Sequence, residues 1–176
     1  IKKGLVEFVY EEREKDSKGL KFSNQGGWQS DFEYCRFDNI LLSTVTKALN
    51  SYFENDVLDM SKKITYNGLW MNINEKDNYN LAHNHPGCHL AGVFWIQTPK
   101  GCGNLEFQNP HSFTMFQEMM RYTEIFQKKS NAYQVYTFPP REGTILLFPA
   151  SLMHKVDPSQ SDEDRISVAF NLHLSV

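Results

Sequence analysis

The chain has 176 residues, a hydrophobic content of 40% and a formal net charge of −3 at neutral pH. This length and composition suit one domain with its own core, so we expect a single domain over residues 1–176. No apolar run approaches the roughly 20 residues that cross a bilayer, and the scattered basic residues form no stripe that could neutralise phosphates, so the composition disfavours a membrane protein and strong nucleic-acid binding.

The first predicted element is a helix over residues 37–55. Leu41, Val45 and Leu49 recur there at helical spacing, and Asp38 precedes them as a candidate N-cap. Because the apolar residues share one face, we expect this helix to cover the outside of a sheet.

Most of the remaining chain alternates between polar and apolar residues with a period of two. These segments are rich in β-branched and aromatic residues, and Gly, Pro, Asn or Asp separate most of them. The pattern predicts a mainly β protein with strands at 64–74, 88–97, 104–108, 132–138, 144–149 and 165–176.

Residues 110–130 lie between two of these strands and have a mixed helical pattern. They form either a second helix or a long insertion, and long insertions in compact domains are often lids over a site. Their apolar side chains fit a lid or a cap on the core equally well; these are Phe113, Met115, Phe116, Met119, Met120 and Phe126.

The segment "HNHP" places His83 and His85 two residues apart. In a strand, such residues point the same way at a spacing of roughly 6.5 Å, so both imidazoles can face one cation. The pair alone is weak evidence for a metal site, because two surface histidines produce the same pattern.

The C-terminal region contains a further histidine before a polar loop, "DPSQSDED". The loop has the composition of a turn, so we predict an antiparallel hairpin that pairs Val156 with Arg165. In that register His154 lies opposite Ser167, and His154, Arg165 and Ser167 share one face.

The two faces of the last predicted strand differ in polarity. One face is apolar and consists of Ile166, Val168, Phe170, Leu172 and Leu174, whereas the other consists of Arg165, Ser167, Ala169, Asn171 and His173. The polar face fits a cavity wall or a strand face that meets water. The segment "WMNIN" shows a similar split, with Trp70, Asn72 and Asn74 on its polar side.

The cysteines are Cys35, Cys88 and Cys102. They are odd in number and form no CxxC pair, which indicates neither a disulfide framework nor a zinc knuckle. This pattern fits a reducing compartment, so we expect a cytoplasmic protein. The sequence indicates no oligomeric state.

Taken together, these motifs resemble those of the 2-oxoglutarate- and iron(II)-dependent oxygenases. The resemblance rests on "HNHPGCHLAGVFWI", "TPKGCGNLEF", "EGTILLFPASLMHKV" and "RIS", in this order. Over residues 26–175 the chain is similar to a bacterial and cyanophage group of these enzymes that is distantly related to prolyl hydroxylases. The resemblance implies a double-stranded β-helix, a jelly roll of two sheets, with one or two flanking helices.

The resemblance also implies a metal centre. It makes His83, His85 and His154 the ligands of Fe(II), with His85 at the place where the family usually has a carboxylate. Three histidines favour late first-row divalent ions, zinc included, over calcium or magnesium. The nearest substitute for His85 is His89, four residues further on. We expect His111 to be solvated in the insertion and His173 to be a hydrogen-bonded residue of the cavity wall.

The remaining implied residues bind the cosubstrate, 2-oxoglutarate. Arg165 matches the basic residue that pairs with its far carboxylate, and Ser167 can add a hydrogen bond. Asn72 is a candidate cosubstrate contact, and Trp95 stands where prolyl hydroxylases often place a tyrosine.

The activity implied by the resemblance is hydroxylation of a C–H bond by O2, with conversion of 2-oxoglutarate to succinate and CO2. The expected substrate is a protein side chain, an amino acid or a small metabolite. Two alternatives remain: a non-oxidative, cupin-like enzyme that uses zinc or manganese and does not need Arg165, and a metal-free jelly-roll binding module.

Overall fold

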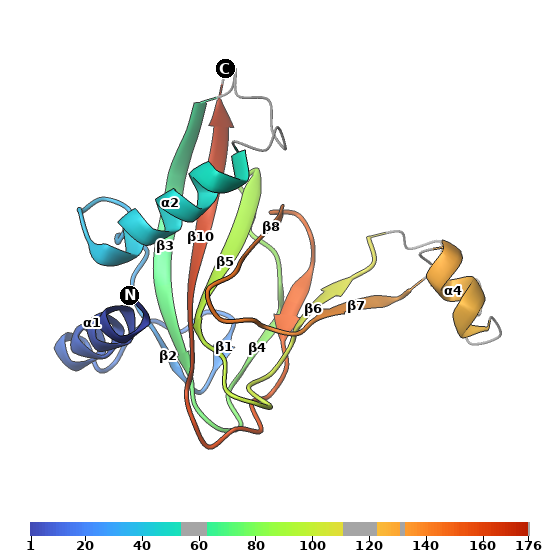
Figure 1. Cartoon of the computed structure of the whole chain (residues 1–176), viewed down its shortest axis with the longest axis horizontal. Coiled ribbons are helices and arrows are strands. Elements are labelled where there is room, and N and C mark those ends of the chain that lie inside the picture. Colours follow the sequence, from blue (N-terminus) through green and yellow to red (C-terminus); the bar gives the residue numbers. More distant parts are fainter. Residues whose placement is uncertain (54–62, 111–122, 131–132, 176) are drawn as a thin grey trace.

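In a computed structural model of the chain, residues 1–53, 63–110, 123–130 and 133–175 are described. Their strands form two antiparallel sheets that pack into a jelly roll (Figure 1), which confirms the predicted fold class. The first sheet has the order β1-β4-β9-β6-β7 and the second the order β2-β3-β10-β5-β8.

The bounds of the elements are close to the predicted ones for the long strands. The first sheet contains β1 (Asn24–Gln25), β4 (Tyr79–His83), β9 (His154–Val156), β6 (Leu105–Gln108) and β7 (Val135–Phe138). The second contains β2 (Trp28–Gln29), β3 (Lys63–Asn74), β10 (Arg165–Ser175), β5 (Leu90–Gln97) and β8 (Ile145–Pro149). The helices are α1 (Lys2–Lys15), α2 (Ile40–Phe53) and α4 (Glu124–Ser130).

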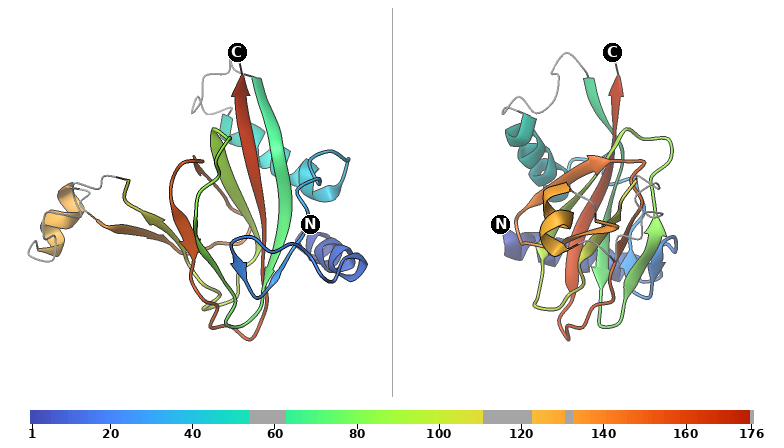
Figure 2. Two further views of the ribbon diagram at one scale, coloured as in Figure 1. Left: turned by 180° about the vertical axis from the view of Figure 1, so that it is seen from behind. Right: turned by 90° about the vertical axis from the view of Figure 1, so that its right-hand side faces the viewer.

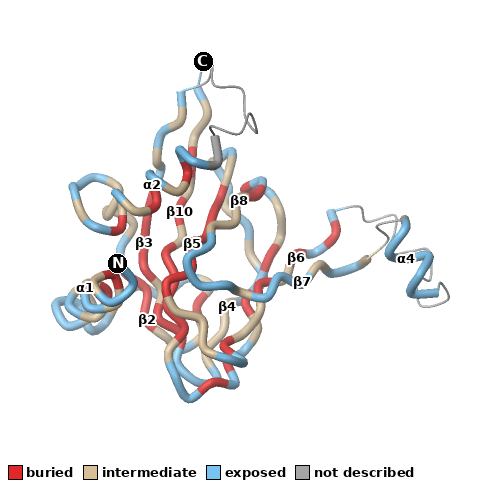
Figure 3. The backbone as a smooth tube through the Cα atoms, viewed as in Figure 1, coloured by how far each residue is buried: buried red, intermediate tan, exposed pale blue. Residues whose placement is uncertain are grey.

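Helices α1 and α2 cover the outer face of the second sheet (Figures 1 and 2), as predicted for the helix at 37–55. Leu5 and Val9 of α1, one helical turn apart, join Leu41 and Val45 of α2 in the main apolar core. Figure 3 shows that buried positions concentrate along β3, β10 and β5. The sheet is therefore enclosed on one face by helices and on the other by the first sheet.

The N-cap of α2 is Asn39 and not the predicted Asp38. The Asn39 Oδ1 atom accepts a hydrogen bond from the backbone N–H of Leu42 at 2.8 Å. Both residue types can cap a helix, and the side chain that reaches the third N–H of the helix decides which one does so.

The predicted C-terminal hairpin is wrong. Val156 in β9 pairs with Asn80 and Leu105 of the first sheet, whereas Arg165 in β10 pairs with Asn74 of the second. The intervening loop crosses from one sheet to the other, and its backbone bonds to other loops; for example, the N–H of Gln160 donates to the carbonyl of Gly101 at 2.7 Å, and that of Ser159 to Asn78 at 3.1 Å. Turn-like composition does not determine which strand is the partner.

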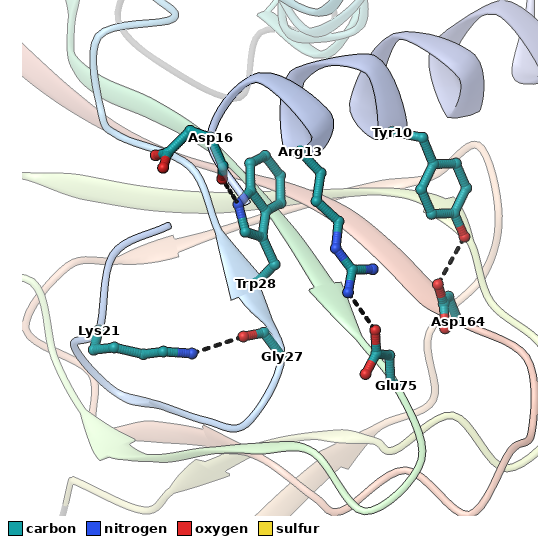
Figure 4. A network of polar contacts seen from close by, with 8 residues as sticks. All are labelled: Tyr10, Arg13, Asp16, Lys21, Gly27, Trp28, Glu75 and Asp164. Carbon is teal, nitrogen blue, oxygen red and sulfur yellow. Dashed lines mark hydrogen bonds and ion pairs between the residues drawn. The ribbon is translucent and has the colours of Figure 1, made fainter. Parts of the chain in front are cut away.

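Two polar contacts connect helix α1 to the ends of β10 and β3, the strands that line the cavity described below (Figure 4). Tyr10 donates a hydrogen bond to Asp164 at 2.7 Å, and Arg13 pairs with Glu75. Burial, and then the Asp164 carboxylate, raise the pKa of Tyr10 to about 12. Because Asp164 directly precedes Arg165 in the chain, this contact fixes the start of β10.

The predicted insertion is only partly described. Its end forms α4, which lies at the far end of the β6–β7 pair (Figure 1), with Ile125 and Phe126 exposed. The other apolar residues named above for this segment, and His111, lie outside the described residues. In the part of the chain that is described, no helix has the length and apolar character that a membrane crossing requires.

Candidate metal and cosubstrate site

Three histidines from the first sheet converge on one point. His83 ends β4 and pairs directly with His154, the first residue of β9, and His85 follows two residues after β4. One ring nitrogen from each histidine lies within 4.8 Å of the others, and the Nε2 atoms of His85 and His154 are 3.2 Å apart. The strand register thus brings together residues 69 or more positions apart in the sequence.

Backbone carbonyls orient two of the three rings. The Nδ1 atom of His83 lies 2.7 Å from the carbonyl of Leu81, and that of His154 lies 2.8 Å from the carbonyl of Leu152. Since a carbonyl only accepts, each Nδ1 carries the proton, and each Nε2 keeps a free lone pair. This is the arrangement that prepares an imidazole to bind a metal.

Burial keeps the three imidazoles neutral at neutral pH. It lowers the pKa of His83, and it is the main cause that lowers the pKa of His85 and of His154 to about 4. Mutual repulsion with His83 adds to both shifts, and the nearby amide of Asn171 opposes the shift of His85. Neutral imidazoles bind a cation without first losing a proton.

The second sheet contributes a buried cation. Arg165 is only 2% exposed, and its Nη1 donates to the Ser167 hydroxyl at 3.0 Å, while its Nε–H has no partner. Within the described residues no carboxylate forms an ion pair with it. Burial lowers the pKa of Arg165 to about 10, so the guanidinium still carries its charge at neutral pH. A buried cation without an anion is costly, and an anionic ligand would remove that cost.

A cavity of about 560 Å³ between the sheets joins the two groups. Its wall includes His83, His85 and His154 from one side and Asn72, Arg165, Ser167, Ala169 and Asn171 from the other. The polar face of β10 therefore lines a cavity, and the opposite face is core: Ile166, Val168, Phe170 and Leu172 are fully buried there. A larger surface hollow along α2, of about 1020 Å³, is lined by none of the predicted site residues.

Asn72 and Trp95 occupy different places relative to this cavity. Asn72 is half-buried in its wall and pairs across the strands with Ser167. Trp95 pairs with Ser167 from the other side but packs into the apolar cluster between the sheets, and its buried Nε1–H has no partner. Trp95 thus stands beside the cavity and does not line it.

His89, the substitute considered for His85, lies outside the histidine group. Its Nδ1 accepts a hydrogen bond from the N–H of Leu174 at 3.1 Å and lies 3.3 Å from Nδ1 of His173. His85 therefore fills the place beside His83 and His154.

Sequence analysis did not identify two aromatic residues of the cavity, Phe22 and Phe32. They lie in the loops before β1 and after β2, and these loops reach the cavity through the pairing of β1 with β4 and of β2 with β3. A local pattern therefore gave no signal for them, whereas Trp70, which stacks on His85 with ring centroids 5.7 Å apart, belonged to the predicted polar face of its strand.

Solved structures share this fold. A viral collagen prolyl hydroxylase from Paramecium bursaria Chlorella virus 1, solved with 2-oxoglutarate, is 13% identical and has a TM-score of 0.61 over 100% of this chain and 92% of that one. The carbocyclase SnoK of nogalamycin biosynthesis, described as α-ketoglutarate dependent, is 12% identical, with a TM-score of 0.66 over 99% and 74% of the two chains.

A 2OG-Fe(II) oxygenase family protein from Burkholderia pseudomallei is 13% identical, with a TM-score of 0.56. The alignment covers 76% of this chain and only 56% of the Burkholderia protein, so the chain spans little more than half the length of that relative. At these identities the likeness shows the fold alone.

A search of curated proteins finds no match to the chain. Residues 68–171, which include all three histidines and Arg165, match the family described as "Putative 2OG-Fe(II) oxygenase". Fe(II) and 2-oxoglutarate are the cofactor and cosubstrate of this family. Since the match covers more than half of its residues, the chain belongs to the 2OG-Fe(II) oxygenase family.

Proposed function

We propose that the protein is a 2-oxoglutarate-dependent dioxygenase that hydroxylates a C–H bond of a protein side chain, an amino acid or a small metabolite. The observation that carries the proposal is the buried, unpaired Arg165 in the same cavity as the histidine group. A non-oxidative metalloenzyme would need the histidines but not this arginine, and a metal-free binding module would need neither.

The donor set fits Fe(II). His83, His85 and His154 would hold the ion through ring nitrogens, leaving its other positions for the cosubstrate and O2. Bound iron supplies the oxidation of 2-oxoglutarate to succinate and CO2 and the insertion of oxygen into the substrate. With His85 in place of a carboxylate, the protein adds no negative charge to the ion, so the two negative charges of 2-oxoglutarate would neutralise it.

The chain's own residues would orient the cosubstrate. Arg165 would pair with its C5 carboxylate through two parallel hydrogen bonds, and the Ser167 hydroxyl would add another. The partnerless Nε–H of Arg165 is a buried donor in the cavity wall that suits a carboxylate acceptor. The apolar surroundings of the cavity would limit access of water to the reacting atoms.

Substitution of Arg165 tests the proposal. Truncating one partner of a buried charge pair typically costs about 2–5 kcal/mol, so Arg165→Ala should raise the dissociation constant of 2-oxoglutarate roughly 30-fold or more. Arg165→Lys should lose less because it keeps the charge, and Arg165→Met tests the same loss while filling the volume. Isothermal titration under anaerobic conditions with Fe(II) present would measure each value.

Two controls accompany these variants. Fe(II) affinity without cosubstrate should be unchanged in the Arg165 variants, since Arg165 is not a ligand, and Arg36→Ala, a change at an exposed arginine paired with Glu33, should leave cosubstrate binding unchanged. If 2-oxoglutarate binds Arg165→Ala and Arg165→Met as tightly as the parent, the cosubstrate assignment fails and the zinc or manganese alternative is favoured.

A further inference from the structure

An unbroken row of aromatic rings runs from the surface to the histidine group. Phe22, which is 62% exposed, lies 5.2 Å from Phe32 between ring centroids, and Phe32 lies 4.9 Å from Trp70. Trp70 is buried and stacks on His85, which in turn stacks on His154 with an interplanar angle of 3°. We call Phe22, Phe32 and Trp70 the aromatic row.

The aromatic row belongs to the cavity. All three of its residues line the same cavity as the histidines and Arg165. An exposed phenylalanine at the mouth of a cavity has no role in the core, and such apolar surface typically marks a ligand contact. The position of the row beside His85 means that a ligand lying on it would end next to the proposed metal.

The charges around the aromatic row disfavour an ionic ligand of either sign. Among the described residues that line the cavity, Arg165 is the only Lys, Arg, Asp or Glu residue, so the wall offers a cation no carboxylate, and under the proposed function Arg165 already pairs with 2-oxoglutarate. A charged ligand would also lose its hydration without gaining a partner.

One polar group of the wall suits a neutral ligand that can donate a hydrogen bond. The Oδ1 atom of Asn171 is buried in the cavity wall beside His85, whose ring can donate to one of its two lone pairs. The second lone pair of this amide oxygen stays open to a donor on the ligand. An amide N–H or a hydroxyl on the ligand would satisfy it.

We infer that the substrate presents an uncharged, apolar group to the aromatic row and donates a hydrogen bond to Asn171. This inference rests on the proposed function, because it describes the substrate of the same site. It excludes substrates whose reacting part is a carboxylate or an ammonium group, and it favours amide- or hydroxyl-bearing aliphatic groups.

Three probes of nearly equal shape test the inference: cyclohexanecarboxamide, cyclohexanecarboxylate and cyclohexylmethylammonium. Each is titrated into the protein loaded with Fe(II) and 2-oxoglutarate without oxygen, and relaxation of the probe protons by the paramagnetic iron reports binding near the metal. We expect the neutral amide to bind at least about tenfold more tightly than either charged probe.

A matched pair of variants links this binding to the aromatic row. Phe22→Ala should weaken binding of the amide probe about fivefold or more, whereas Phe37→Ala should leave it unchanged, because Phe37 is equally exposed, at 65%, but does not line the cavity. Asn171→Ala should weaken binding of the amide probe more than binding of cyclohexyl methyl ketone. The ketone has nearly the same shape but cannot donate a hydrogen bond.

The inference is overturned if either charged probe binds as well as the amide, if no probe binds the loaded protein, or if Phe22→Ala and Phe37→Ala behave alike. Failure of the proposed function would give a different experimental result. In that case the parent protein does not take up Fe(II) and 2-oxoglutarate before any probe is added.

Discussion

Histidine rings lie close together at two places in this chain, and the two groups differ in burial and in the hydrogen bonds of their ring nitrogens. The Nδ1 atoms of His89 and His173 are 3.3 Å apart, about as close as the Nε2 atoms of His85 and His154 at 3.2 Å. His89 is exposed and its Nδ1 accepts a backbone N–H, whereas His154 is buried and its Nδ1 is held by a backbone carbonyl.

The comparison shows that proximity alone does not make a metal site. In the group of His83, His85 and His154, burial keeps the rings neutral and carbonyls aim two of the Nε2 lone pairs toward a common point. In the pair of His89 and His173, one lone pair is already used within the protein. A third donor, a fixed tautomer and an adjacent cavity together distinguish the candidate site.

The largest expected effect separates these two groups. His83→Ala and His154→Ala should each abolish stoichiometric Fe(II) binding, because two remaining histidines cannot hold the ion in the same way. His89→Ala is the matched control and should bind Fe(II) like the parent. Metal content after anaerobic loading and desalting would measure all three.

Circular dichroism of the same samples shows whether the variants keep the fold. Tight binding that persists in both His83→Ala and His154→Ala would refute the assignment of the ligands. Loss of Fe(II) binding in His89→Ala would instead mean that His89 contributes to the metal site.

A smaller effect is expected at the third ligand. His85→Asp should still bind Fe(II), with an affinity within roughly tenfold of the parent, because aspartate restores the type of ligand that the family usually has at this place. A competition assay with a metal indicator dye would give the ratio. Complete loss of binding in this variant would mean that the second ligand is misplaced.

The polar wall of the site could be predicted from the sequence because it follows the period of a strand. Arg165, Ser167 and Asn171 alternate with core residues along β10, and Asn72 alternates in the same way along β3. The convergence of His83 and His85 could also be anticipated from their spacing, although His85 lies beyond the end of its strand.

The relation between the two walls could not be predicted. His154 and Arg165 were assigned to one hairpin, yet they face each other from different sheets, since each strand pairs with partners distant in sequence. Phe22 and Phe32 reach the cavity through loops without periodicity, and helix α1 has only Leu5 and Val9 buried along its length. Such features depend on long-range packing, which local patterns do not encode.

The most direct test of the account is a titration of the parent protein with Fe(II) and 2-oxoglutarate in the absence of oxygen, followed by visible absorption. We predict a weak charge-transfer band of a bidentate 2-oxoacid on iron that appears only when both components are present and saturates at one 2-oxoglutarate per chain. Zinc in place of iron should give no band, and Arg165→Met should need a far higher cosubstrate concentration. A protein that binds Fe(II) but gives no band at saturating 2-oxoglutarate, or that binds 2-oxoglutarate equally well without metal, would contradict the account.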